Sequence, residues 1–143
     1  MRSKVLNEAG ERSFALIFDT GDEPVSLLER FAREHNLTAA RFTAIGAFRE
    51  VVVGYFDWEK KDYLRIPIRE QVEVLSLVGD VAIGDKGPKI HAHVVLGKRD
   101  GSAHGGHLLE AKVRPTLEVV LTESPAVLVR EHDAASGLAL IRV

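Results

Sequence analysis

Alternation of apolar and polar residues is the commonest pattern along this chain, and it predicts a protein built mainly of strands. The predicted strands cover residues 12–18, 40–47, 50–57, 63–68, 71–83, 89–97 and 116–122, a short segment at 126–131, and 138–143. Most of them are joined by short polar turns, such as the one at 57–62. We therefore expect neighbouring segments to pair in an antiparallel sheet.

One segment has the spacing of a helix instead. Its apolar residues recur with the period of a single buried stripe, at Val25, Leu28, Phe31 and Ala32. Asp22 is the predicted N-cap, Pro24 suits the first turn, and the helix is expected to end near Asn36. Many strands with one or two helices predict an α+β domain with a mostly antiparallel sheet. Its 143 residues suit a single domain over 1–143.

The predicted strand at 71–83 differs from the others because both of its faces are largely apolar after Glu73. Such a strand is expected at the centre of a sheet that is covered on both sides. A helix would cover one face. A second sheet or another subunit would cover the other.

Composition narrows the chemistry that the chain can carry. The absence of cysteine excludes disulfides and thiolate ligands, and leaves histidine, carboxylates and water to bind a metal. The 19 basic and 21 acidic residues give a formal net charge of −2, which weighs against DNA because affinity for phosphate requires Lys and Arg. The alternative of a basic patch that forms only when the chain is folded stays open.

Targeting signals are absent from the sequence pattern. No stretch approaches the ~20 apolar residues that a membrane span needs. The first eight residues lack the apolar segment of a secretory signal. We therefore expect a cytoplasmic protein with no membrane partner.

Four of the six histidines lie between positions 91 and 107, and this clustering indicates a metal site. His91 and His93 share one face of the strand at 89–97, because side chains alternate along a strand. The opposite face is apolar and belongs to the core. A turn at 98–101 folds the chain back beside this strand, so that His104 or His107 could supply a third ligand.

Other interpretations of these residues stay open. The histidine pair also fits two solvent-facing side chains on a half-exposed sheet. Gly105 and Gly106 indicate that something approaches the backbone, which could be a ligand, a bend in an edge strand or a neighbouring subunit. His107 is favoured as the third ligand because it follows the glycines. On a regular strand His104 faces the opposite way from His107. Three interpretations of His104 stay open: a fourth ligand, a residue that supports a ligand, or an exposed side chain.

The order of these motifs resembles the plants and prokaryotes conserved (PPC) domain family. The resemblance rests on the segments 44–48 and 72–79, the His91-x-His93 pair, Asp100-Gly101, and Gly105-Gly106-His107-Leu108. It implies an α+β fold with a highly curved antiparallel sheet, a Gly-centred hairpin at 44–48, and a homotrimer. In plants the domain follows a DNA-binding AT-hook, and this chain contains no Arg-Gly-Arg-Pro hook. DNA is thus a partner by family association only.

The chain is also similar, more distantly, to acetolactate decarboxylase, whose zinc is held by an H-x-H pair and a histidine after Gly-Gly. Matching the motifs implies that His91, His93 and His107 bind a divalent metal, with zinc the expected ion. The loop between the pair and Gly-Gly-His is longer here, so metal binding transfers better than the reaction does.

Three functions follow, in order of preference. The first is a homotrimeric PPC-domain protein of unassigned biochemical role that binds a divalent metal, with a small-molecule or a regulatory function. The second is a DNA-associated or protein-interaction regulatory module. The third is a metal-dependent enzyme similar to the decarboxylase. The sequence identifies no substrate and no catalytic residue.

Overall fold

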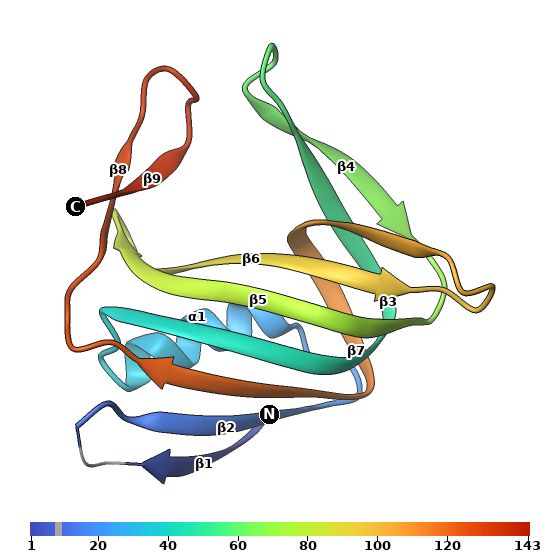
Figure 1. Cartoon of the computed structure of the whole chain (residues 1–143), viewed down its shortest axis with the longest axis horizontal. Helices are drawn as coiled ribbons and strands as arrows, with labels where there is room; N and C mark the ends of the chain where they lie inside the picture. The colour runs from blue at the N-terminus through green and yellow to red at the C-terminus, as the bar shows by residue number, and fades with distance from the viewer. Residues whose placement is uncertain (8–9) are drawn as a thin grey trace.

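The computed structural model describes residues 1–7 and 10–143 of the chain (Figure 1). In this part of the chain, nine strands accompany one α-helix. Their bounds are β1 Arg2–Asn7, β2 Ser13–Asp19, α1 Pro24–Glu34, β3 Ala39–Asp57, β4 Asp62–Ile68, β5 Val72–Gly84, β6 Gly87–Gly97, β7 Ala103–Glu123, β8 Val129–His132 and β9 Ala139–Arg142. Strand β1 was not predicted, and the predicted strand at 116–122 is only the second half of β7.

All nine strands belong to one sheet, and the predicted α+β class with a mostly antiparallel sheet is confirmed. Strands β3, β5, β6 and β7 form a closed circuit, because each pairs antiparallel with the next and β7 returns to β3. The circuit curves the sheet strongly, as Figure 1 shows. Among the described residues, the one parallel pairing joins β5 to β8, between Ile83 and Val129.

The hairpin predicted around Gly46 is wrong, because residues 39–57 form one long bent strand. Gly46 has a φ of 149°, and the pairing register shifts beside it on both neighbouring strands. A Cβ atom at Gly46 would lie 2.3 Å from the carbonyl oxygen of Thr116. The glycine therefore bends the strand and lets β7 approach, where the sequence had indicated a turn.

The N-cap of helix α1 lies one residue later in the chain than predicted. Glu23, rather than Asp22, is the N-cap, and its carboxylate accepts hydrogen bonds from the amides of Val25 and Ser26. Asp22 instead binds the amino group of Met1 at 2.8 Å. Pro24 starts the helix as predicted. The buried face of the helix packs on β6 and β7.

The core lies on one face of the sheet, under the helix. Leu77 of β5 is 1% exposed, whereas Leu75 and Val78 are 55% and 50% exposed. The other face of this strand is thus exposed in the single chain, so the expectation that a second sheet covers it is wrong, and cover by another subunit stays a prediction. A bulge between Val74 and Ser76 changes which side chains face inward. No helix in the described residues is long and apolar enough to span a membrane.

Candidate metal centre

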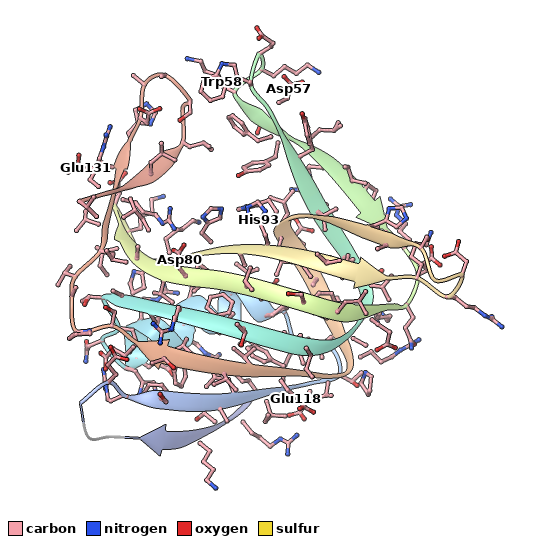
Figure 2. All side chains as sticks on the ribbon, in the orientation of Figure 1. Asp57, Trp58, Asp80, His93, Glu118 and Glu131 are labelled. Carbon is pink, nitrogen blue, oxygen red and sulfur yellow. The ribbon has the colours of Figure 1, made fainter. Side chains whose placement is uncertain are left out.

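Strand β6 presents its histidines on the face opposite the core, as its alternation predicts. Four of its apolar residues are buried, namely Ile90, Ala92, Val94 and Leu96. Between them, His91 is half-buried and His93 is exposed. In Figure 2, His93 lies on the side of β6 where the β3–β4 arm and the β8–β9 hairpin rise.

The hairpin from β6 to β7 brings the third histidine to the other two. His107 lies directly opposite His93 in the antiparallel register. Each of His91, His93 and His107 has a ring nitrogen within 4.8 Å of those of the other two. His104 pairs with Leu96, is exposed and stands outside this group. The cluster of four in the sequence is therefore a triad in space.

The spacing of the ring nitrogens fits one metal ion. Nε2 of His91 and Nε2 of His93 are 3.2 Å apart, and two nitrogens bound to one tetrahedral zinc at about 2.0–2.1 Å lie about 3.3 Å apart. Nδ1 of His107 is buried and has no hydrogen-bond partner among the described residues, which is a costly state for a polar atom. Three imidazoles without a thiolate also form a donor set that zinc accepts.

The two glycines before His107 are explained by the chain's own backbone. A Cβ atom at Gly106 would lie 2.7 Å from the carbonyl oxygen of Gly54, and one at Gly105 would lie 2.8 Å from that of Val94. The glycines thus let β7 pass closely between β3 and β6. They position His107 in the triad, and neither a ligand nor a second subunit is needed to account for them.

Strand β4 supplies an aromatic wall for the triad. The ring of Tyr63 stacks on that of His107, with centroids 4.5 Å apart and planes 22° from parallel. Gly54 makes room for it, since a Cβ atom there would lie 2.7 Å from Cδ1 of Tyr63. This stacking fixes the orientation of the His107 ring and raises the pKa of Tyr63 through burial.

An acidic side chain supports the triad from β5. Asp80 lies opposite His91 in the pairing of β5 with β6, and its Oδ2 is 3.9 Å from Nδ1 of His91. Its other oxygen, Oδ1, accepts a hydrogen bond from Arg130 at 2.5 Å. At 3.9 Å this carboxylate acts on His91 through its negative charge rather than through a hydrogen bond.

Burial and neighbouring charges keep His91 and His107 in the form that binds metals. The pKa of His107 falls from the ordinary 6.5 to about 4, first through burial and then through the positive charges of neighbouring histidines, Arg130 and Lys89. Burial also lowers the pKa of His91, and Asp80 opposes this shift. Both rings are therefore neutral at pH 7, and a neutral imidazole is the form that binds a metal.

We expect the metal-free chain to lose stability as the pH falls from about 6.5 to about 4. In this range the unfolded chain protonates His107 while the folded chain does not, so that protons favour unfolding. Urea unfolding in the presence of a chelator, compared with that of His107→Asn, isolates this contribution. An identical pH dependence in the two proteins would contradict the assignment.

Sequence reasoning missed three residues that surround the triad: Tyr63, Asp80 and Arg130. Asp80 had a visible signal, because it interrupts the otherwise apolar end of the strand at 71–83. Tyr63 and Arg130 come from distant segments, and nothing in their local sequence indicates that they meet the histidines.

Comparison with known proteins agrees with this fold and motif order. The model of the Plants and Prokaryotes Conserved (PCC) domain matches residues 6–125. The chain belongs to this family. Among curated proteins no match was found.

Several solved structures resemble this PPC protein over nearly its whole length. A metal-containing protein from Archaeoglobus fulgidus is 41% identical, with a TM-score of 0.85, over 92% of this chain and 93% of that one. A PPC protein from Pyrococcus horikoshii is 30% identical, with a TM-score of 0.87, over 99% and 95%. A protein from Ralstonia eutropha, provisionally named as DNA-binding, is 27% identical, with a TM-score of 0.85, over 91% and 90%.

The distant similarity to acetolactate decarboxylase concerns the fold alone. The Bacillus subtilis enzyme shares 13% identity with this PPC protein, with a TM-score of 0.54, over 88% of this chain and 58% of the enzyme.

Proposed function

We propose that this chain is a homotrimeric PPC protein that binds one divalent metal ion, of the zinc type, through His91, His93 and His107. The observation that carries the proposal is the convergence of the three imidazoles at a spacing that suits one ion. The relative from Archaeoglobus fulgidus, which is described as containing metal, supports it. A metal bound there would polarise a ligand oxygen or lower the pKa of a bound water.

A titration of the chelator-treated protein with Zn²⁺ tests the metal site. Isothermal calorimetry is expected to give one ion per chain, and elemental analysis after gel filtration is expected to find that ion retained. A protein that takes up no Zn²⁺, Co²⁺ or Mn²⁺ contradicts the proposal.

The exposed face of the sheet supports the homotrimer. His93, Val78, Thr43 and Val120 lie side by side on adjacent strands and therefore share one face. Exposed apolar side chains continue along it, namely Ile45, Leu75, Val78, Val95 and Val120. A run of exposed apolar residues on one face is typical of an interface. A second copy on this face would cover the strand that the sequence predicts to be covered on both sides.

We expect Val120→Asp to dissociate the trimer, because the interface would then bury an unpaired carboxylate. Light scattering coupled to gel filtration would show a mass near the chain mass of 15.7 kDa in place of three times that mass. Val127→Asp is a matched control, since Val127 is also exposed, at 62%, but lies outside the sheet. A wild-type protein that runs as a monomer would contradict this part of the proposal.

A second candidate function is DNA association. The name of the relative from Ralstonia eutropha favours it, whereas the net charge of −2 opposes it. A mobility-shift assay with duplex DNA tests whether the chain binds DNA. A complex whose affinity falls steeply with salt supports this function, because phosphate contacts release counterions. The lack of any complex at low salt removes it.

A further inference from the structure

A cavity of about 190 Å³ opens beside the histidine triad. His91 and His107 form one wall, and the β8–β9 hairpin forms another through Arg130, Leu138 and Leu140. The hairpin lies outside the residues that match the family domain, which end at 125. This wall therefore comes from residues that follow the matched segment.

We propose that this cavity binds a small organic carboxylate, whose charged group meets Arg130 and Lys89 while an oxygen reaches the metal. The inference rests on the metal site proposed above. It adds the class of ligand and the residues that select it.

Arg130 is the main reason to expect an anion. Its side chain is only 7% exposed. Its two terminal nitrogens donate hydrogen bonds, at 2.5 Å to Asp80 and at 3.2 Å to the carbonyl oxygen of Ala139. Its Nε is buried and has no partner in the described part of the chain. Arg130 also lines the cavity, so a charged oxygen held there would interact with the guanidinium and offset the cost of leaving this donor unpaired.

The balance of charge points in the same direction. Asp80 offsets the positive charge of Arg130. Oε1 of Glu29 lies 3.6 Å from Nζ of Lys89 and offsets the positive charge of Lys89. The three histidines add no negative charge, so a divalent ion at the triad would keep both of its positive charges. An anionic ligand would reduce this excess of positive charge. A cavity of low polarity stabilises such a charge poorly.

The size and lining of the cavity favour an organic ligand over an inorganic one. A water molecule occupies about 30 Å³ of liquid, so the space admits a ligand of several heavy atoms. Leu138 and Leu140 line it with apolar surface. That surface would contact a short hydrocarbon portion, whereas phosphate or sulfate would gain nothing from it.

The experiment uses the Co²⁺-loaded full-length chain, whose visible absorption reports on ligands that join the metal. Propanoate is the probe, propanamide is its uncharged counterpart, and inorganic phosphate tests the alternative anion. We expect propanoate to shift the spectrum and propanamide to leave it unchanged. A response to phosphate without one to propanoate overturns the proposed ligand class.

Variants then connect the ligand to the two cations. Arg130→Gln and Lys89→Gln, each fully loaded with Co²⁺ before the titration, are expected to weaken propanoate binding by about tenfold or more. Lys89→Gln leaves the bond between Arg130 and Asp80 intact, so it reports on the ligand even if Arg130→Gln loosens the hairpin. Arg142→Gln, on the same hairpin and exposed, is the matched control.

The failure of this inference is distinguishable from failure of the metal site. Normal Co²⁺ binding without any response to propanoate overturns the carboxylate proposal and leaves the metal site standing. Affinity for propanoate that is equal in the wild type and both variants overturns the roles of Arg130 and Lys89. A chain that binds no Co²⁺ overturns both proposals.

Discussion

The His107→Ala variant is expected to lose its bound zinc almost completely, whereas His104→Ala keeps one ion per chain. His107 is the only member of the triad that β7 supplies. Without it, two histidines on the open face of β6 would hold the ion with water alone. We expect affinity for Zn²⁺ to fall more than about 100-fold, because even the loss of a residue that merely supports a ligand costs about 10- to 100-fold.

His104→Ala is a close control for this experiment. The two histidines lie on the same strand, three residues apart, and His104 is exposed outside the triad. Elemental analysis and calorimetric titration of both variants measure the difference. Equal zinc content in the two proteins would remove His107 from the site.

The strands that carry the triad were predictable because their information is local. Alternation along residues 89–97 is enough to separate His91 and His93 from the buried face. The turn at 98–101 sets the antiparallel return, and the register then places His107 opposite His93. A hairpin is the one long-range contact that a short sequence segment largely determines.

The surroundings of the triad were not predictable in the same way. Arg130 reaches the site through a bond to Asp80, which is 50 residues away in the chain. Tyr63 does so because β4 folds back along the far half of β3. Such contacts depend on how the whole sheet curves, and alternation along one strand contains no information about curvature.

Gly46 is a second feature whose role the local sequence did not predict. Its sequence context suits a turn between two strands, and the structure uses its freedom to bend one strand. The near half of β3 pairs with the end of β7, and the far half pairs with the segment of β7 that includes His107. The bend therefore connects the core of the sheet to the metal centre.

We accordingly expect Gly46→Ala to lower the free energy of unfolding by about 3 kcal/mol, as the sum of backbone strain and overpacking. The new methyl group would lie 2.3 Å from the carbonyl oxygen of Thr116 and 2.8 Å from Cα of Leu117. Neither contact is with a flexible side chain, so relief requires β3 and β7 to separate. Urea unfolding of the metal-free protein, at one fixed protein concentration, measures the loss.

Gly101→Ala provides the matched control for Gly46→Ala. Gly101 also has a positive φ, of 82°, but no atom lies within 4 Å of a Cβ built there. Its substitution is expected to cost only the backbone term, about 1 kcal/mol. Because the Gly46 bend connects the core of the sheet to the far half of β3, Gly46→Ala is also expected to weaken Zn²⁺ binding, whereas Gly101→Ala is not. Equal losses of stability in the two variants would show that the close approach of β7 does not depend on glycine at position 46.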